Sequence, residues 1–484
     1  MASIEEIRAA RLKKRDLLKK RGMNPHPASS NRDMPLGELS QSFDEYIKKN
    51  KKPTVAGRLM SLRIQGKIIF TTLYDGSGKF QVVVEEETLG RDDFDLFQDT
   101  VDVGDFLEFK GGLIITKRGT PSLKASSWLM LSKTLRPLPE KWHGLQDVEE
   151  RYRRRYLDIL MDPEVKELFL KKAEFWKVSC QFLEERGFVQ VHTPSLEVTT
   201  GGAEAQPFKT HHNDSGMDLF LRISVGELWQ KRLMAAGFNR TYEIGQVYRN
   251  EGSSSEHVQE FTNIEFYVAY LDFESGKKLV KDLYCEVAEK VFGRTTFSTR
   301  GHDFNLADEW KEYDYVSIVE EMTGINILNA SDSQIEAKLK ELKVKFEGKN
   351  RERLVDSLWK YCRKRISGPA FLVNHPRLVA PLSRSHEDDE RLTKTFQVII
   401  AGSEVGRAHS ELNDPLDQAD RFKEQQKLIE EGDKEAMMPD WEYVEMLEYG
   451  MPPTFGFGFP ERLFAFMADK SLREATLFPL MKIK

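Results

Sequence analysis

Two neighbouring stretches in the middle of the chain hold an arginine, an aromatic ring and carboxylates. Residues 241–270 have the pattern of two strands joined by a polar loop, with Arg249 ending the first strand and Phe261 and Glu265 in the second. In such a hairpin an arginine can clamp a phosphate, a ring can stack on a base and a carboxylate can hold a cation. The alternative is an ordinary ion pair at a sheet edge, from Arg249 to Glu251 or Glu265.

The second of these strands, 260–270, predicts which side chains share a face. Successive side chains of a strand point to opposite sides of the sheet. We expect the more apolar set to face a core and the more polar set to face a binding site. The first set is Ile264, Phe266, Val268 and Tyr270, and the second is Phe261, Asn263, Glu265 and Tyr267.

The composition bounds the class of protein. A chain of 484 residues is too long for one ordinary core, so at least two domains are expected. The 72 Lys and Arg against 78 Asp and Glu exclude a generally basic RNA-coating protein, so any RNA contact must use a local patch. Three distant cysteines without a CxxC pair argue against a disulfide framework and a zinc ribbon. No apolar run approaches the roughly 20 residues of a membrane span, and a cytoplasmic protein without membrane association is predicted.

Changes in composition and in residue pattern divide the chain into four parts. Residues 1–52 are predicted to form a basic N-terminal helix, over 1–22, and a linker. The helix could attract RNA phosphates or simply pack a few leucines, and the sequence favours neither. Residues 53–137 contain short strands with turn signals at close spacing, which favours a small barrel of the oligonucleotide-binding (OB) type. A linker at 138–164 and a large domain at 165–484 follow.

Three motifs, in order along the chain, resemble the signatures of the class II aminoacyl-tRNA synthetases. Residues 182–194 are similar to motif 1, which builds the dimer interface of that family. Residues 249–251 with 260–261 are similar to motif 2. Residues 456–462, followed by 472–479, are similar to motif 3. One match could be chance, but three in the required order are specific.

Within this family the chain resembles the lysyl-tRNA synthetases over nearly its whole length. Residues 249–252, Arg-Asn-Glu-Gly, have the lysine-type form, whereas aspartate and asparagine enzymes usually have Arg-Asp-Glu there. The resemblance implies an α+β fold, in which an N-terminal OB-type β-barrel precedes a class II catalytic domain with a mainly antiparallel sheet flanked by helices. Further similar landmarks lie at 136–139, 151–158, 200–203, 207–208, 211–214 and 411–415.

The resemblance also implies a role for individual residues. Arg249, Arg462 and Glu404 would be catalytic, and Glu404 would hold magnesium. ATP would be bound by Arg249, Glu251, His257, Phe261, Glu404 and Arg462. Lysine would be bound by Gly202, Glu227, Arg249, Glu265, Tyr267 and Glu411. Two carboxylates and a tyrosine hydroxyl suit a buried ammonium group, which needs opposite charge and satisfied hydrogen bonds.

In the barrel, Arg63, Phe70 and Gln81 match positions at which the family reads the uridine-rich anticodon. A ring that stacks on an unstacked base, with polar side chains beside it, is the usual means of single-strand recognition. From the strand pattern alone, Phe70 would instead be an ordinary core residue of the barrel.

The implied reaction is the ATP-dependent activation of L-lysine to lysyl-adenylate and its transfer to the 3′ end of tRNA(Lys). ATP is a substrate, Mg²⁺ is the implied cofactor, and a homodimer through motif 1 is expected. Two alternatives stay open from the residues. One is an RNA-binding or regulatory paralogue that keeps the fold without aminoacylation, and the other is a class II synthetase with altered amino-acid specificity.

Three positions depart from the family pattern. Gln397 stands where a second acidic metal ligand is usual, and a neutral amide binds Mg²⁺ more weakly, which leaves the number of metal ions open. Arg407 and His409 replace an asparagine and an aromatic residue of the lysine pocket. Arg407 would repel an ammonium group unless an acid lies between them or it turns outward to an ion pair.

The spacing of two acidic residues makes a further prediction. Glu404 and Glu411 are an odd number of residues apart, so a regular strand would point them to opposite faces. If both serve one site, the strand must bend near Gly406.

Overall fold

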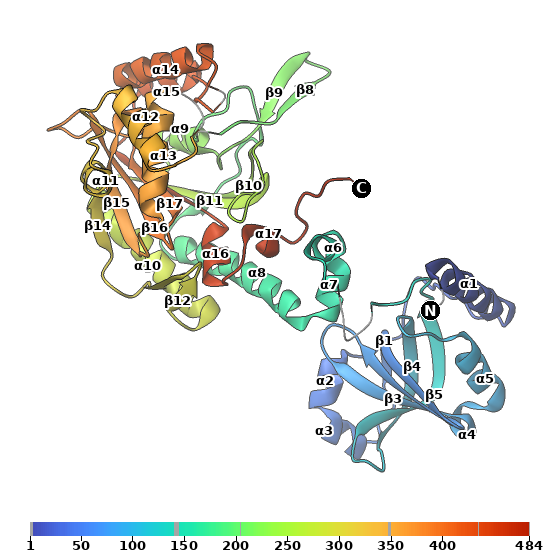
Figure 1. Ribbon diagram of the computed structural model, residues 1–484. Coiled ribbons are helices and arrows are strands. Elements are labelled where there is room, and N and C mark those ends of the chain that lie inside the picture. The colour runs from blue at the N-terminus through green and yellow to red at the C-terminus, as the bar shows by residue number, and fades with distance from the viewer. Residues whose placement is uncertain (1–2, 140–144, 204, 347–349, 434, 484) are drawn as a thin grey trace. The chain divides into compact units, whose positions relative to one another are not determined.

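The computed structural model describes residues 3–139, 145–203, 205–346, 350–433 and 435–483, and the chain divides into two compact units (Figure 1). The first unit ends at Leu145 and the second begins at Gln146. Among the described residues, no helix combines the length and the apolar character needed to cross a membrane.

The first unit is a closed five-stranded barrel, which confirms the OB-type prediction. Its strands follow the order β1-β2-β3-β5-β4, with β3 and β5 parallel and the other pairs antiparallel. Inward side chains alternate along each strand, and Leu59, Leu73, Val82 and Phe109 are among those in the core. The strands are β1 (Thr54–Gln65), β2 (Ile68–Tyr74), β3 (Lys79–Glu85), β4 (Phe106–Ile115) and β5 (Pro121–Ser132).

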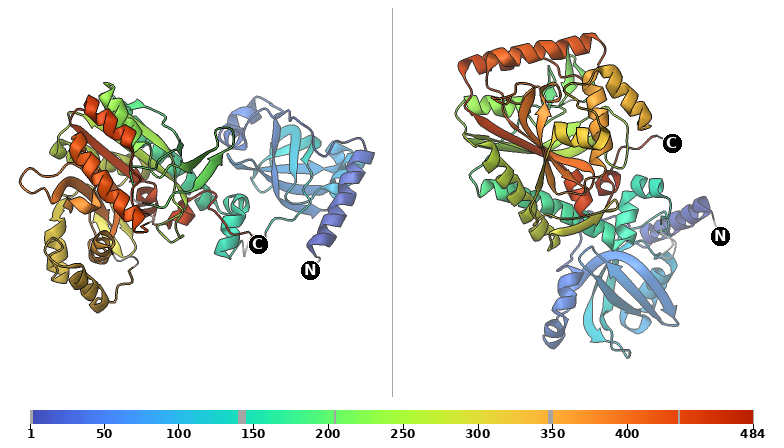
Figure 2. Two further views of the ribbon diagram at one scale, coloured as in Figure 1. Left: turned by 90° about the horizontal axis from the view of Figure 1, so that it is seen from above. Right: turned by 60° about the vertical axis from the view of Figure 1, so that its left-hand side comes forward.

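Helices pack on the outside of this barrel (Figure 2). Helices α4 (Glu86–Leu89) and α5 (Arg91–Thr100) connect β3 to β4. Residues 24–35, the linker-like part of 1–52, are all described and contain no helix or strand, but α2 (Leu36–Gln41) and α3 (Phe43–Lys48) follow before position 52, and their apolar side chains complete the barrel core.

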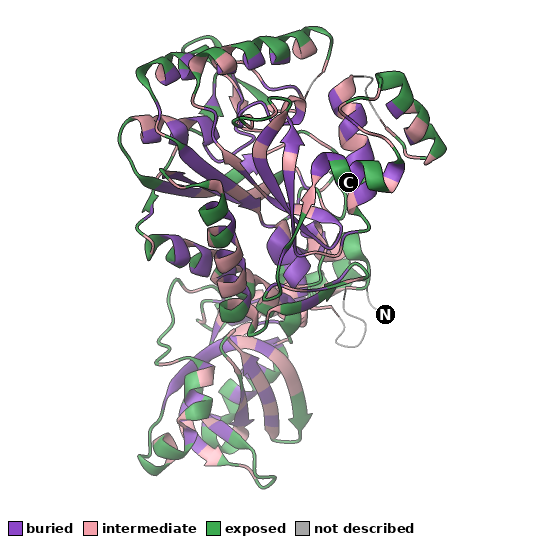
Figure 3. Cartoon of the chain, turned by 90° about the vertical axis from the view of Figure 1, so that its left-hand side faces the viewer, coloured by how far each residue is buried: buried purple, intermediate pink, exposed green. Residues whose placement is uncertain are grey.

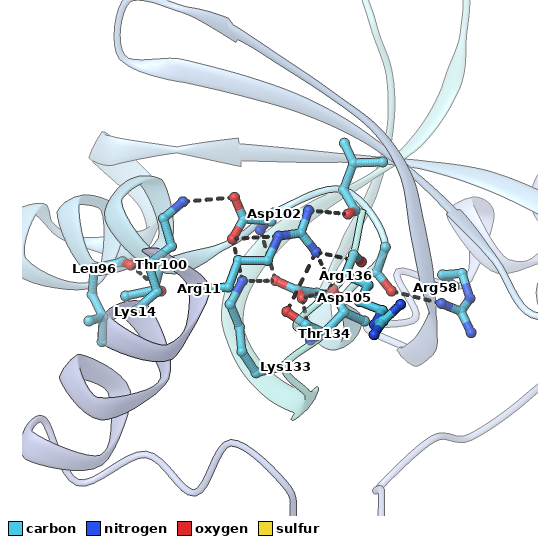
Figure 4. Close-up of polar contacts among 12 residues, drawn as sticks. Arg11, Lys14, Arg58, Leu96, Thr100, Asp102, Asp105, Lys133, Thr134 and Arg136 are labelled. Carbon is cyan, nitrogen blue, oxygen red and sulfur yellow. Dashed lines mark hydrogen bonds and ion pairs between the residues drawn. The ribbon is translucent and has the colours of Figure 1, made fainter. Parts of the chain in front are cut away.

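The predicted N-terminal helix is α1 (Ile4–Lys20), and it is anchored to the barrel rather than left free. Arg11 is buried and donates to Thr134 Oγ1 at 2.6 Å and to the carbonyl of Arg136 at 3.1 Å. Lys14 and the buried Lys133 both contact Asp102, at 2.7 and 2.5 Å (Figure 4). The packing role is therefore present. Basic side chains also remain exposed on or just after this helix, namely Arg8, Lys13, Lys19, Lys20 and Arg21.

The second unit is built on an eight-stranded sheet of order β14-β15-β16-β17-β18-β11-β10-β6. The pairs β14–β15 and β10–β6 are parallel and the others are antiparallel, which confirms the mainly antiparallel prediction. The strands are β6 (Val189–Gln190), β10 (Arg240–Tyr248), β11 (Glu260–Ala269), β14 (Lys311–Asp314), β15 (Ala370–Pro376), β16 (Leu392–Ile400), β17 (Ser403–Ser410) and β18 (Thr454–Pro460).

One face of this sheet packs on two long helices, α8 (Pro163–Glu184) and α10 (Phe273–Phe292). Their apolar side chains and those of the central strands form one core, and Figure 3 shows the strands largely buried. The opposite face is overlaid by α9 (Glu227–Ala235) and α13 (Arg351–Arg363), which contribute side chains to a cavity described below. One face of the sheet thus forms the core of the unit, and the other face lines the cavity.

The alternation predicted for β11 is correct except at its end. Ile264, Phe266 and Val268 belong to the core. Tyr270 does not, because the strand ends at Ala269 and Tyr270 has a φ of +65° and a 74% exposed side chain.

The linker predicted at 138–164 is wrong for most of its described part. Residues 140–144 lie outside the described residues, but 148–161 form α6 (Val148–Arg153) and α7 (Arg155–Met161) within the second unit. Arg155 is buried, pairs with Asp158 at 2.8 Å and donates to the carbonyl of Leu477 at 3.2 Å. These contacts with the C-terminal segment hold the two helices in place.

The remaining elements surround the sheet. A three-stranded sheet of order β7-β9-β8 includes the β8–β9 hairpin, which projects from the body of the unit (Figure 1). The elements are β7 (Leu196–Glu197), β8 (Lys209–His212), β9 (Met217–Leu221), β12 (Thr296–Thr299), β13 (His302–Asn305), α11 (Tyr315–Thr323), α12 (Asp332–Glu341), a 3₁₀ helix (Arg377–Val379), α14 (Pro415–Glu430), α15 (Trp441–Tyr449), α16 (Arg462–Met467) and α17 (Leu472–Ala475).

Candidate active site

A cavity of about 380 Å³ lies on the open face of the large sheet. Side chains from strands β11, β16, β17 and β18 and from helices α9 and α13 line it. Every residue that the sequence predicted for ATP, lysine or metal in this unit lines the cavity. They are Gly202, Glu227, Arg249, Glu251, His257, Phe261, Glu265, Tyr267, Glu404, Glu411 and Arg462.

The β10–β11 hairpin places Arg249 beside Phe261. Val247 pairs with Phe261 across the hairpin, and the Arg249 guanidinium lies 5.3 Å from the centroid of the Phe261 ring. Arg249 Nη2 approaches the carbonyl of Ile223 at 3.5 Å, and Arg249 Nε is buried without a hydrogen-bond partner in the described part of the chain. The sheet-edge ion pair considered above is not formed there. A guanidinium with an unused donor is suited to bind an oxyanion.

Arg462 occupies the same end of the cavity. Its Nη1 donates to the backbone carbonyl of Glu404 at 2.9 Å, and its Nε donates to the carbonyl of Glu256 at 3.2 Å. Burial lowers the pKa of Arg462 to about 10, so it stays charged at neutral pH. On the loop between the strands, burial raises the pKa of Glu251, and His257 Nδ1 lies 2.8 Å from Ser254 Oγ.

Glu265 lies at the other end of the cavity, held by neutral donors. The backbone N–H of Val225 and the amide of Asn263 donate to Oε1 at 2.8 and 2.9 Å, and the Tyr267 hydroxyl donates to Oε2 at 3.3 Å. Burial, followed by repulsion from Glu227, raises the pKa of Glu265 to about 7.

Lys231 lies fully buried beneath this end and was not predicted as a site residue. Its Nζ contacts Glu227 Oε1 at 2.7 Å and Glu411 Oε2 at 2.5 Å. Burial alone would lower the pKa of Lys231, but the two carboxylates raise it above its usual value. Burial raises the pKa of Glu411 to about 8 despite this pairing. The four-residue spacing of Glu227 and Lys231 on α9 was the signal that could have found the pair.

Two glycines leave room at the same end. A Cβ at Gly456 would lie 2.1 Å from Glu411 Oε1 and 2.5 Å from the Tyr267 ring. Gly202 has a φ of +91°, and a Cβ there would lie 2.9 Å from Glu227 Oε2. Glu411 Oε1 is buried and accepts no hydrogen bond from any described residue. A buried acceptor without a donor, on a residue that lines the cavity, is suited to an ammonium ligand.

The bend predicted in β17 is present. Val398 pairs with Gly406 and Ile399 with Glu404, so Val405 is an extra, bulged residue. Val405 packs in the core, whereas Glu404 and Glu411 both line the cavity. Because of the bulge, the side chains of Glu404 and Glu411 lie on the same face of the sheet.

The predicted metal ligand Glu404 already has protein partners. Its Oε1 accepts from Trp359 Nε1 at 2.6 Å, and Arg363 Nη1 lies 3.7 Å away. Burial opposes ionisation, but Arg363 and Trp359 hold the pKa of Glu404 below its usual value. Gln397 Oε1 lies 3.0 Å from His375 Nε2.

The side chains of Glu404 and Gln397 can be tested for their fit to a metal ion. No group of three or more His, Cys, Asp or Glu side chains that could hold a metal is found among the described residues. Mg²⁺ that arrives with a nucleotide needs only one or two carboxylates, because phosphates and water complete its shell. A single carboxylate therefore fits a magnesium ion carried by ATP, and does not fit a further ion held mainly by protein.

Arg407 and His409 also line the cavity. Arg407 Nη2 donates to the carbonyl of Val379, and its Nε is buried without a partner among the described residues, so the outward ion pair considered above is not formed there. His409 Nδ1 lies 3.0 Å from Thr395 Oγ1. Burial, and then Arg407, lower the pKa of His409 well below its usual value, which keeps the ring neutral.

In the barrel the structure brings Arg63, Phe70 and Gln81 to neighbouring positions on β1, β2 and β3. Arg63 pairs with Phe70, with its guanidinium 5.1 Å from the ring centroid. Gln81 pairs with Thr72, and its Nε2 donates to Ser122 Oγ at 2.9 Å. Phe70 is half-buried and lies outside the barrel core, so the prediction of an ordinary core residue is wrong.

Comparisons with known proteins agree with this geometry. Residues 147–482 match the family model of class II tRNA synthetases (D, K and N), and residues 54–131 match the OB-fold nucleic acid binding domain. Two curated relatives named lysine–tRNA ligase cover 99% of this chain. The protein from Thermotoga maritima is 40% identical, with 97% of its own length covered, and that from Roseiflexus sp. strain RS-1 is 39% identical, with 99% covered.

A third relative of the same name, from Carboxydothermus hydrogenoformans, is 39% identical over 99% of this chain and 98% of its own length. The family model, the end-to-end identity and the cavity between motifs 2 and 3 lead to one conclusion. This chain belongs to the class II aminoacyl-tRNA synthetases of the aspartate, lysine and asparagine group.

Proposed function

We propose that this chain is a lysine–tRNA ligase, which activates L-lysine with ATP and transfers it to tRNA(Lys). The observation that carries the amino-acid assignment is the buried Oε1 of Glu411, which has no partner among the described residues and belongs to a residue that lines the cavity. With Glu265 and Tyr267 beside it, this end of the cavity offers a lysine ε-ammonium group opposite charge and hydrogen-bond acceptors. Gly202 and Glu227 would meet the α-amino group.

The first step is the attack of a lysine carboxylate oxygen on the α-phosphorus of ATP, with pyrophosphate as the leaving group. Arg249 would bind both the carboxylate and the α-phosphate, and Phe261 would stack on adenine. Arg462, with Glu251 and His257, would bind the remainder of ATP. Since the attacking oxygen carries no proton, positioning and charge stabilisation suffice without a general base.

We propose that magnesium enters with ATP and that Glu404 is the carboxylate that meets it. The ion would neutralise the phosphates and assist the departure of pyrophosphate. The support is the carboxylate of Glu404, whose pKa lies below its usual value and which lines the cavity together with Arg249, Arg363 and Arg462.

The second step is the attack of a terminal ribose hydroxyl of tRNA(Lys) on the lysyl carbonyl, with AMP as the leaving group. We assign anticodon recognition to the barrel at 53–137 through Arg63, Phe70 and Gln81, and catalysis to the domain at 165–484. A half-buried ring beside a guanidinium and an amide supports the assignment, since every base has a face on which a ring can stack.

A cytoplasmic homodimer formed through motif 1, residues 182–194, is part of this proposal. Its support is a group of exposed apolar side chains in and just after that motif, at Val189 (51%), Leu196 (51%) and Val198 (65%). Exposed apolar groups of this size favour burial against a second copy.

Amino-acid-dependent exchange of pyrophosphate into ATP, measured with each of the twenty amino acids, tests the proposal. Exchange with lysine alone is expected. Exchange with another amino acid would overturn the specificity. No exchange with any amino acid would overturn the activity and favour an RNA-binding paralogue.

A further inference from the structure

Two residues that depart from the family pattern, Gln397 and Arg407, are direct partners in the sheet. Gln397 on β16 pairs with Arg407 on β17, and both side chains line the cavity. The resemblance to the lysyl-tRNA synthetases implies an acid at position 397 and an asparagine at position 407, where this chain has Gln397 and Arg407. Taken together, a negative charge has been lost and a positive charge has been gained on adjoining positions. The two departures are therefore one local exchange of charge.

Gln397 is already engaged in a neutral contact. Its Oε1 lies 3.0 Å from Nε2 of the buried His375. Burial, and then Arg407, lower the pKa of His375 to about 3, so the ring is neutral at physiological pH. A carboxamide that faces an imidazole adds no charge with which to hold a divalent cation.

Arg407 has donors to spare. One Nη2 bond goes to the carbonyl of Val379, whereas Nε is buried and finds no acceptor among the described residues. Buried N–H groups are nearly always paired in native proteins, so an unpaired one that lines a ligand cavity indicates that a ligand oxygen completes it. The fixed charge of Arg407 also repels a cation placed beside it.

A second guanidinium lies on the remaining carboxylate. Arg363 Nη1 is 3.7 Å from Glu404 Oε1, and Arg363 Nε is likewise buried without an acceptor among the described residues. The indole of Trp359, 1% exposed, donates to the same oxygen at 2.6 Å and fixes the orientation of the carboxylate. Arg363 thus places a fixed positive charge beside the carboxylate of Glu404.

We propose that the guanidinium groups of Arg363 and Arg407 take the place of a magnesium ion held by the protein between positions 397 and 404, so that metal enters this site only with ATP. This inference rests on the proposed function of the cavity. Guanidinium groups serve this role because they present several donors in one plane and match phosphate oxygens. The positive charge that faces the ATP phosphates is then supplied by Arg363 and Arg407 instead of by a magnesium ion held by the protein.

The number of bound Mn²⁺ ions tests the inference on the unaltered protein. The chain is saturated with a β,γ-methylene analogue of ATP and titrated with Mn²⁺, and free Mn²⁺ is followed by electron paramagnetic resonance. We expect a single Mn²⁺ for each bound nucleotide, and no tight binding without nucleotide. Two or more ions for each nucleotide would overturn the inference. Lysine-dependent pyrophosphate exchange at saturating Mg²⁺ is measured in parallel, so failure of the proposed function is seen separately.

A paired substitution provides the converse test. Gln397→Glu together with Arg407→Asn restores the acid and removes the cation, and we expect at least one additional Mn²⁺ for each bound nucleotide. Arg365→Ala is the matched control, because Arg365 carries the same charge near the same helix end but is exposed and bonded to Tyr361. The control should bind as many ions as the unaltered chain. A gain in the control, or an unchanged count in a folded paired variant, contradicts the exchange of charge.

Discussion

At the end of the cavity that contains Glu265 and Glu411, acidic side chains outnumber the cations that contact them. Lys231 ion-pairs with Glu227 and Glu411, and no described cation forms an ion pair with Glu265. Buried carboxylates in this state either bind a proton or attract a cationic ligand. The raised pKa values of Glu265 and Glu411 are the first response, and a substrate ammonium group would be the second.

Replacing Glu265 removes charge without changing shape. We expect Glu265→Gln to raise the KM for lysine by about 10- to 100-fold, the equivalent of one hydrogen bond to a charged group, with a much smaller effect on the KM for ATP. Steady-state pyrophosphate exchange measures both constants. Glu260→Gln, an exposed position on the same strand, is the control and should behave like the unaltered chain. Equal effects on both constants would make Glu265 a structural residue.

Lysine binding should depend on pH through the same carboxyls. Below pH 7 both Glu265 and Glu411 hold protons, because their pKa values are raised to about 7 and about 8. A protonated carboxyl cannot pair with an ammonium group, so binding must release protons and affinity must rise with pH. We expect the KM for lysine at pH 6.5 to exceed that at pH 8.5 by about tenfold or more, since one pKa unit corresponds to a tenfold change.

Calorimetry of lysine binding in buffers of different ionisation enthalpy, at pH 7, measures the proton release directly. Proton uptake, or a KM that does not change between pH 6.5 and 8.5, would contradict the assignment. Without lysine, stability should fall as pH rises from the ordinary carboxyl pKa of 4.5 to about 7 to 8, and should level off above that. Between those values the folded state keeps protons that the unfolded chain, with ordinary carboxyl pKa values, has already lost.

Among the elements, β18 places Gly456 and Gly458 directly against the side chains that are proposed to bind lysine. We expect Gly456→Ala to raise the KM for lysine by about tenfold or more, because its Cβ would displace Glu411 or Tyr267. ATP binding at the other end should change less. Pyrophosphate exchange and a thermal melt distinguish this local effect from unfolding. Gly112→Ala is the control, since its Cβ would meet no atom within 4 Å. A Gly456→Ala chain with an unchanged lysine KM would exclude this role for the glycine.

Local patterns predicted the elements that present the site. Strand alternation placed Glu265 and Tyr267 on the cavity face. The spacing of Glu404 and Glu411 predicted a bend near Gly406, where the structure has a bulge at Val405. Both predictions succeed because side-chain alternation depends only on neighbouring residues.

Contacts between distant segments were missed. Trp359 and Arg363 reach Glu404 from α13, about forty residues earlier in the chain, and nothing in their local sequence indicates that contact. The linker prediction fails at α7 because Arg155 is anchored on the carbonyl of Leu477, more than three hundred residues away, and the local sequence does not indicate this contact. Lys231 was overlooked because a Glu–Lys pair at four-residue spacing is usually a solvated surface pair.

For the whole molecule, the proposed division of labour can be tested at one ring. We expect Phe70→Ala to lower kcat/KM for tRNA(Lys) by about 5- to 150-fold, as loss of one base stack does. Lysine-dependent pyrophosphate exchange, which needs no tRNA, should be unchanged. Aminoacylation and exchange assays on the same preparation give both values. Ile115→Ala, a 59% exposed residue of the same barrel, is the control. Loss of exchange in the Phe70 variant would contradict independent action of the two units.

The anchoring of α1 has a consequence for engineering. Arg11 fastens the helix that precedes the barrel to Thr134 and Arg136, which follow its last strand. The N-terminal helix of the first unit is therefore hydrogen-bonded to the segment that follows its last strand. A chimaera that exchanges residues 3–139 as one cassette would keep the contacts of Arg11 within a single parent protein. A chimaera with its junction at residue 53 would take Arg11 and its partners from different parents. On the proposed assignment of anticodon recognition to the barrel, such cassettes would change the anticodon that is recognised and leave the amino acid that is attached unaltered.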